Sequence, residues 1–447
     1  MAGKQREKGL ICPVLLYTKT NTPRLQYIAL FLGSYFETGV EITSDTEVFK
    51  GYTGVRINYS AQLLSDRELW IAPVELLFEN GINPVPVQVF NHPKGYKAFF
   101  QTQCPSGFDL FAATFYLISR YEEYLPHEKD SYGRYAHTAS LAFKENFLHL
   151  PLVNIWLRHF LEQLVEVFKK VNYCTPTYRF VPTYDIDIAW SYKHKGFLRN
   201  AGGFARSFAK GAWADLKERA LVLFNRLEDP YDSYQWMDRL HEAFRLKPIY
   251  FFHVGLKPHA LDKNIPADNA SFQHLVRYIA GRCRFGLHPS WRSSTAAGIL
   301  EKEKMTLEDI TGIEVRASRQ HYIRLNLPQT YEQLRAAGIR EDYSMGYGSI
   351  NGFRASVASS FFFYNLEKEE ATDLLVHPFC FMEANSFFEQ RLTAEEALRE
   401  MLHYYNEIKG VGGTYITVWH NHFLGADKLY AGWKEIYKEA LATISAS

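Results

Sequence analysis

Two acids at alternate positions of a predicted strand could carry acid–base or metal chemistry. In TYDIDIAW, Asp185 and Asp187 are two residues apart, and alternate side chains of a strand project from the same face. Two carboxylates on one face repel unless a positive group lies between them. At the end of a strand, one acid can ligate a divalent cation while the other accepts a proton from water. The plainer alternative is an Asp-x-Asp pair that only caps the strand.

Four later segments place further polar residues after strand-like runs or in loops. They are His288 in GLHPSWRSS, Arg319, His321 and Arg324 in SRQHYIRL, Asp342 in REDYSMGYG, and His420 in TYITVWHNH. Each alone is compatible with a structural side chain. Barrel enzymes, however, place their sites at the C-terminal ends of successive strands. We therefore expect five residues to converge at one end of a barrel: Asp185, Asp187, His288, Arg319 and His420.

The elements that must position these residues alternate regularly. Strand-like runs such as RFVPTYDIDI, PIYFFHVG and TYITVWHN alternate with amphipathic helical runs such as DSYQWMDRLHEAFRL and SFQHLVRYIAGR. Repeated strand–helix units imply parallel strands, and over roughly 270 residues the natural closure is a (β/α) barrel. We predict an α/β chain in which a smaller mixed α/β domain over 1–175, of unknown role, precedes a barrel domain over 176–447.

Composition excludes several classes of protein. The 447 residues are 47% hydrophobic and 22% charged, which favours a globular chain with a sizeable core. Lys and Arg total 50 against 49 Asp and Glu, a balance that argues against nucleic-acid binding. The five cysteines form no C-x-x-C pair, which indicates a reducing compartment. No apolar run reaches about 18 residues, so we expect a cytoplasmic protein without a membrane-spanning helix.

With these segments in hand, residues 176–447 resemble the polysaccharide deacetylase family, the NodB-homology or carbohydrate esterase family four domain. The resemblance implies a distorted (β/α) barrel that uses a divalent metal, commonly zinc, to remove N- or O-acetyl groups from sugars. TYDID is similar to a variant of the first family motif, which implies that Asp185 is the catalytic base and Asp187 a metal ligand. Residues 1–175 look like the extra N-terminal domain of some bacterial members, and that likeness implies no chemistry.

The later family motifs are matched less closely. The third, R-x-P-Y, resembles Arg319 to Tyr322, with histidine in place of proline. This implies that Arg319 orients the base and that the backbone N–H of Tyr322 holds the oxyanion. The fourth is matched loosely by Asp342 with its neighbour Tyr343, which implies a catalytic role for Asp342. The fifth is similar to TVWHNH, which implies that His420 protonates the leaving group.

The metal motif H-[ST]-x-x-H departs from the family pattern. His288 matches its first histidine, but Arg292 stands where the second is expected. Arginine is a permanently charged donor and cannot ligate a cation. Another group must complete the ligand set if a metal binds. The first histidines to test are His253, which we take as the tentative third ligand, and His321.

The resemblance thus implies a metal-dependent hydrolase, of the class that acts on carbon–nitrogen bonds other than peptide bonds, which removes an N- or O-acetyl group from a sugar or glycan precursor. Four residues could contact the substrate: Trp291, Arg292, Tyr343 and Trp419. The alternative is a non-catalytic, glycan-binding relative with an incomplete metal site, in which Arg292 and the same rings hold the ligand. A third alternative is a different hydrolase or lyase on the same barrel, because a fold does not fix function.

A basic segment follows the proposed catalytic strand. Residues 191–226 contain eight Lys or Arg and two acids. Such an insertion could dock on an anionic membrane surface or guide a lipid-linked sugar into the site. The plainer interpretation is a solvated helical excursion.

Overall fold

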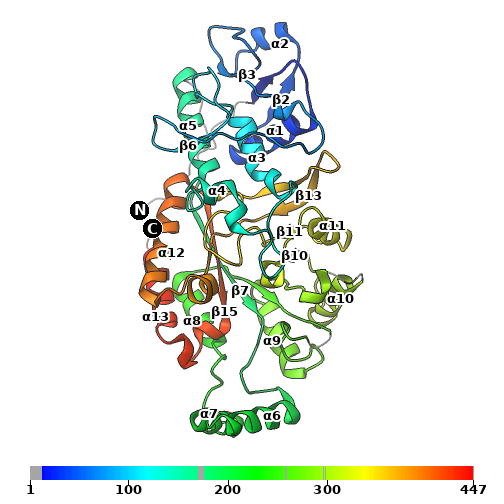
Figure 1. The fold of residues 1–447 in the computed structure, drawn as a ribbon, viewed down its shortest axis with the longest axis vertical. Coiled ribbons are helices and arrows are strands. Elements are labelled where there is room, and N and C mark those ends of the chain that lie inside the picture. The colour runs from blue at the N-terminus through cyan, green and yellow to red at the C-terminus, as the bar shows by residue number, and fades with distance from the viewer. Residues whose placement is uncertain (1–12, 170–175, 257–258, 295, 297, 446–447) are drawn as a thin grey trace, which may run out of the picture. The chain divides into compact units, whose positions relative to one another are not determined.

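The computed structural model describes the chain except for residues 1–12, 170–175, 257–258, 295, 297 and 446–447. The chain divides into two compact units (Figure 1). The first takes in the described residues up to Arg179, together with 353–378 and 406–414. The second takes in 180–352, 379–405 and the described residues from Tyr415 onward. The domain prediction gave both later segments of the first unit to the second domain. Whether 1–175 and 176–447 act as separate domains stays a prediction.

The first unit contains a four-stranded parallel sheet with the order β2-β1-β3-β4. Its strands are β1 (Val14–Tyr17), β2 (Val40–Thr43), β3 (Val55–Tyr59) and β4 (Leu69–Ile71). Its helices are α1 (Pro23–Tyr35), α2 (Thr46–Gly51), α3 (Leu110–Ile118), α4 (Leu141–Lys144) and α5 (Leu152–Val167). Two antiparallel hairpins complete it: β5 (Phe90–Asn91) with β6 (Lys97–Ala98), and β12 (Phe361–Asn365) with β13 (Glu370–Val376).

Long-range polar contacts bind residues 353–378 into the first unit. Buried Glu123 accepts hydrogen bonds from Arg120 Nε at 2.7 Å and from Arg354 Nε at 2.8 Å. Burial alone would raise the pKa of Glu123, but the two guanidinium groups outweigh it and hold that pKa at about 2. Tyr27 of α1 donates to the carbonyl of Phe362, and its ring packs on Tyr364. Local sequence periodicity contains no signal for such contacts, which explains why the prediction missed them.

The second unit is built on a sheet with the strand order β11-β10-β9-β8-β7-β15-β14. Its strands are β7 (Arg179–Ile186), β8 (Ile249–Phe252), β9 (Arg284–Leu287), β10 (Ala317–Ser318), β11 (Glu341–Asp342), β14 (Phe381–Met382) and β15 (Thr414–His420). Strands β7 to β11 pair in parallel, as do β14 and β15. The predicted α/β class with parallel strands is confirmed. Barrel closure stays a prediction, because no pairing joins β11 to β14 in the described part of the chain.

Helices separate the strands of the second unit as the periodicity predicts. They are α6 (Gly196–Ala209), α7 (Trp213–Leu223), α8 (Tyr234–Phe244), α9 (Ala270–Ala280), α10 (Ile299–Thr311), α11 (Gln329–Ala336), α12 (Ala394–Val411) and α13 (Trp433–Ser445). Short turns η4 (Trp291–Ser294) and η5 (His321–Ile323) follow β9 and β10. Among the described helices, none is long and apolar enough to cross a membrane.

A buried apolar cluster in the second unit contains Phe251, Tyr343, Phe379 and Val418. Two strands approach so closely beside it that only glycine fits at position 286. A Cβ atom on Gly286 would lie 2.6 Å from the carbonyl oxygen of Ala317 and 2.7 Å from the ring of Phe251. The glycine thus permits the close packing of β9 on β10, whose ends carry candidate site residues.

Candidate metal centre

The candidate site lies where parallel strands of the second unit end. Asp185 is the penultimate residue of β7 and Asp187 follows that strand. His288 comes directly after β9, His321 opens η5 after β10, and His420 is the last residue of β15. The carboxyl ends of parallel strands share one edge of a sheet, which is where α/β proteins form their sites.

Three histidines converge on the carboxylate of Asp187. Oδ1 of Asp187 lies 3.0 Å from Nε2 of His288. Its Oδ2 lies 3.4 Å from Nε2 of His321 and 3.5 Å from Nε2 of His420. One donor atom from each of Asp187, His288 and His321 lies within 4.8 Å of the others. The structure thus brings His321, rather than His253, into the set that includes Asp187 and His288.

Hydrogen bonds on the far side of two imidazoles fix which nitrogen faces Asp187. His288 Nδ1 lies 2.5 Å from the carbonyl oxygen of Arg319. A carbonyl oxygen can only accept, so Nδ1 carries a proton, and the lone pair of the neutral imidazole is on Nε2, facing Asp187. His321 Nδ1 lies 3.0 Å from Oδ1 of Asp262 in the same manner. This carboxylate–histidine pairing is typical of the residues that orient metal ligands.

The donor set fits a divalent cation. Tetrahedral zinc binds nitrogen and oxygen at about 2.0–2.2 Å, which separates neighbouring ligand atoms by about 3.3–3.5 Å. The separations of 3.0 and 3.4 Å are close to that spacing. Despite the 3.0 Å approach, Asp187 Oδ1 is buried without a hydrogen bond in the described residues. A lone pair and a carboxylate oxygen facing each other call for a positive charge between them.

The charges around His321 point in the same direction. Burial opposes protonation of this imidazole, but Asp187 and Asp262 outweigh it and raise its pKa to about 9. A bound cation would take the place of that proton.

His253 lies behind this set rather than in it. Its Nδ1 faces the carbonyl of His288 at 3.2 Å, and its Nε2 lies 3.6 Å from Asp262 Oδ1. Burial and the neighbouring imidazoles of His321 and His288 lower the pKa of His253 to about 3. His253, Asp262 and His321 form a second group of close donors. Asp262 lies in a loop after β8 and was not anticipated, because no local motif marks it.

Asp185 lies beside the cluster and is held by Arg319. Its Oδ1 accepts a hydrogen bond from Arg319 at 2.9 Å, and its Oδ2 lies 3.8 Å from Nε2 of His288. Arg319 is fully buried, with its guanidinium 4.5 Å from the Phe251 ring centroid and its Nε donating to the carbonyl of Tyr343. These contacts fix the guanidinium and therefore the orientation of Asp185.

His420 is paired with a second unanticipated acid, Glu383. Both the backbone N–H and Nδ1 of His420 contact Glu383 Oε1, at 2.7 and 2.6 Å. Burial opposes the charged imidazole, but Glu383 and Asp187 raise the pKa of His420 to about 10. Glu383 directly follows β14. The signal for it was available in HPFCFMEAN, where it is the lone acid after an apolar run.

Three predicted site residues do not face the cluster. The predicted substrate contacts of Trp419 and Tyr343 and the predicted catalytic role of Asp342 are therefore corrected. Trp419 is fully buried and packs on Tyr437, because adjacent residues of β15 point to opposite faces. Tyr343 is buried in the apolar cluster and donates to Glu341. Neither ring presents a surface to a substrate. Asp342 is buried as well, and its carboxylate accepts from Ser318 and from the backbone and hydroxyl of Ser344.

The remaining predicted contacts lie on the two turns beside the cluster. The rings of Trp291 and Tyr322 are 5.7 Å apart and perpendicular, and the Tyr322 ring lies 4.6 Å from that of His321. The backbone N–H of Trp291 donates to Asp262. Trp291, Arg292 and Tyr322 are half-buried, so each retains some surface for a ligand.

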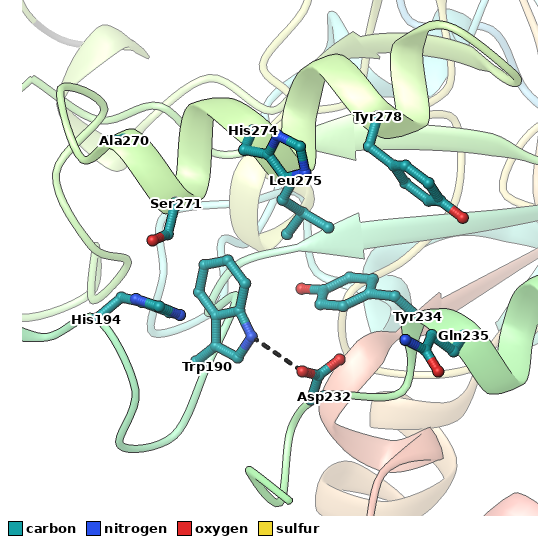
Figure 2. Close-up of a pocket in the computed structure, with 10 residues that line it drawn as sticks. All are labelled: Trp190, His194, Asp232, Tyr234, Gln235, Ala270, Ser271, His274, Leu275 and Tyr278. Atoms are coloured by element: carbon teal, nitrogen blue, oxygen red, sulfur yellow. Dashed lines mark hydrogen bonds between the residues drawn. The ribbon is translucent and has the colours of Figure 1, made fainter. Parts of the chain in front are cut away.

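A separate pocket of about 540 Å³ lies between α8 and α9. Figure 2 shows the Trp190 indole N–H directed toward Asp232, with the Tyr234 ring beside them. None of the residues that line this pocket belongs to the cluster around Asp187. The pocket is therefore distinct from the candidate metal centre.

Comparisons with known proteins give limited matches. Residues 14–169 match the model of a "Family of unknown function (DUF7033)". The comparison with curated proteins gave no match.

The similar solved structures include polysaccharide deacetylases. A protein from Mycobacterium smegmatis that is assigned as a polysaccharide deacetylase has a TM-score of 0.39 and 15% identity, over 61% of this chain and 85% of that one. The PuuE allantoinase has a TM-score of 0.36 and 10% identity, over 61% and 84%. A carbohydrate esterase family 4 pseudoenzyme from Bacillus anthracis has a TM-score of 0.30 and 8% identity, over 61% of each chain. At these values the likeness carries no argument about activity.

Proposed function

We propose that the second unit is a metal-dependent hydrolase that removes an N- or O-acetyl group from a sugar or glycan precursor. The supporting observation is the convergence of two imidazole Nε2 atoms on Asp187, beside the separately held carboxylate of Asp185. In this proposal the sheet of the second unit belongs to a distorted (β/α) barrel.

Asp187, His288 and His321 would hold the cation. Three protein ligands of the His₂-carboxylate type, with one position left open, are typical of catalytic zinc. When bound, the cation supplies Lewis-acid polarisation of the acyl carbonyl and eases deprotonation of water. Asp262 would act as a positioning residue, since its hydrogen bond to Nδ1 directs Nε2 of His321 toward the cation.

Asp185 would serve as the general base. One carboxylate oxygen is engaged by Arg319, which leaves the other to accept a proton from the attacking water. The water oxygen then forms a bond to the acyl carbon. The backbone N–H of Tyr322 is proposed to stabilise the resulting oxyanion.

His420 would serve as the general acid. Its Nδ1 is held by Glu383, so the second proton of the imidazolium lies on Nε2, on the side of Asp187. Transfer of that proton to the departing amine or hydroxyl, as the acyl bond breaks, gives acetate and the deacetylated sugar. Trp291 and Tyr322 offer rings against which a sugar could stack, beside the Arg292 guanidinium.

Acetate release from N-acetylated and O-acetylated oligosaccharides tests this proposal. The zinc-loaded chain is expected to release acetate, and chelation is expected to abolish release. Asp185→Asn should slow release by roughly 10²–10⁴-fold while zinc still binds. The exposed carboxylate of Asp309 provides the control variant Asp309→Asn.

Stoichiometric zinc binding without release from any acetylated sugar would favour the non-catalytic glycan-binding alternative. Failure to bind any divalent cation would overturn the proposal as a whole.

A further inference from the structure

The insertion after β7 forms a helical hairpin with an unusual surface. Helices α6 and α7 lie side by side (Figure 1), and the Phe208 and Trp213 rings pack edge to face across the turn between them. At helical spacing, Phe197, Phe204 and Phe208 share one face of α6. The hairpin is amphipathic, and several of its large apolar side chains are exposed.

Large apolar side chains are strongly exposed along this hairpin. The exposed fractions are 84% for Phe197 and Leu198, 77% for Phe224, 65% for Phe208 and 64% for Trp213. Isolated exposed apolar residues are ordinary, whereas a contiguous group marks a surface that another phase or molecule covers. We therefore expect another molecule or a lipid phase to contact these side chains.

The same segment concentrates positive charge. Residues 191–226 hold eight Lys or Arg and two acids, whereas the whole chain is balanced at 50 and 49. Five of these cations are exposed: Arg199, Arg206, Lys210, Lys217 and Arg226. Exposed aromatic and aliphatic groups beside basic residues are typical of helices that lie in the interface of an anionic bilayer.

The base of the hairpin is tied to the loop that follows the metal-site strand. Asp229 accepts hydrogen bonds from the backbone N–H groups of residues 191–193. Arg199 donates to the carbonyl of Asn264, whose side chain in turn bonds Ala189 N and the carbonyl of His253. The Arg219 guanidinium lies 4.5 Å from the Tyr192 ring centroid. These contacts anchor the base of the hairpin.

We propose that the α6–α7 hairpin docks the protein on an anionic membrane surface. The exposed rings and Leu198 enter the boundary between headgroups and acyl chains, while the exposed cations contact lipid phosphates and carboxylates. A second copy of this chain is a poorer cover, because it would bring a second set of cations against the first. The inference does not depend on the proposed activity.

Co-sedimentation of the full chain with lipid vesicles tests this proposal. The protein is expected to bind vesicles containing about 30% phosphatidylserine, more tightly at low than at physiological salt, and to bind pure phosphatidylcholine weakly. The triple variant Arg206→Gln, Lys210→Gln, Lys217→Gln should bind roughly 100-fold more weakly at low salt, at about fivefold for each cation. The variant Phe197→Ser, Phe224→Ser should bind at least roughly tenfold more weakly.

Matched variants separate the hairpin from general surface effects. The charge control is Lys302→Gln, Lys428→Gln, Lys438→Gln, three exposed lysines elsewhere. The apolar control is Leu63→Ser, Leu429→Ser, two residues that are 62% and 60% exposed. Both controls should bind like the wild type, and circular dichroism should show every variant folded.

Three results would overturn the proposal. They are equal binding to both vesicle types, unchanged binding of the hairpin variants, and a wild-type dimer in sedimentation velocity that the hairpin variants abolish. The last result would assign the surface to a second copy.

Discussion

Replacement of His321 by alanine distinguishes the candidate ligand set that the structure brings together from the set that the family motif implies. His321→Ala removes the imidazole whose Nε2 lies 3.4 Å from Asp187. The matched change is Arg292→Ala, at the position where the resemblance leads one to expect the second histidine. Both residues lie on short turns that follow neighbouring strands. If the structure assigns the ligands correctly, the first change affects metal binding and the second does not.

The size of the effect follows from the number of ligands. Four-ligand zinc sites in small peptides bind with about 10–16 kcal/mol, or roughly 2.5–4 kcal/mol for each ligand. Loss of His321 should therefore weaken zinc binding by roughly 10²–10³-fold. Asp262→Asn, which keeps the imidazole but alters its orienting hydrogen bond, should weaken binding by roughly 10–100-fold. Arg292→Ala should leave zinc affinity within about threefold of the wild type.

Competition with a chromophoric chelator at fixed pH measures the zinc dissociation constant and stoichiometry without reference to turnover. We expect one zinc per wild-type chain. The reasoning is refuted if His321→Ala retains wild-type affinity, or if Arg292→Ala loses it while circular dichroism shows the chain folded. His253→Ala provides a further test. A loss of zinc affinity equal to that of His321→Ala would indicate that the cation binds the second group of donors, which is His253, Asp262 and His321.

Three further predictions concern catalysis and stability. Glu383→Gln should lower the rate of acetate release by roughly 10²–10⁴-fold with unchanged zinc affinity, because it removes the carboxylate that holds the His420 proton; an unchanged rate would contradict the assigned role. Gly286→Ala should lower the free energy of unfolding in urea by about 1–3 kcal/mol, because its Cβ would meet Ala317 O at 2.6 Å; no change would mean that the strands can separate. The pKa of Glu123 is held at about 2, so its ionised carboxylate contributes about 3 kcal/mol to the free energy of unfolding. This contribution is fully present above about pH 4.5 and is lost as the pH falls toward 2. Urea unfolding at pH 7, 4 and 3 should show this loss in the wild type and in the exposed control Glu166→Gln, and not in Glu123→Gln.

The sequence could indicate much of the strand-end arrangement, because strand periodicity and strand order are local signals. Asp185 at the end of β7 and Asp187 just after it occupy alternate positions, and polar residues mark where β9 and β15 end. Because adjacent residues of a strand point to opposite faces, Trp419 and His420 cannot both face the site. The sequence alone therefore contained the information that Trp419 does not contact a substrate there.

Other features depend on contacts that no local pattern reveals. His253 lies in the predicted strand PIYFFHVG, whereas the sequence marks no strand before His321. The backbone after β10 decides which of the two histidines reaches Asp187. Tyr322 and Ile323 adopt positive φ angles of 57° and 53°, a conformation rare for such residues. The partners Asp262 and Glu383 lie 59 and 37 residues from the histidines they orient. Only the tertiary fold brings these pairs together.

A gene split after codon 175 would not yield two independent modules. The first unit draws on the chain in three separate stretches, so each half-gene would encode part of it. Arg24 bonds Glu369, and Asn154 bonds Ser359, across such a split. Co-expressed halves are therefore expected to complement each other and purify together, whereas either half alone should be poorly soluble. Recombination that exchanges the second unit for another must preserve the two returning stretches, which restricts how the two parts could be reassorted in evolution.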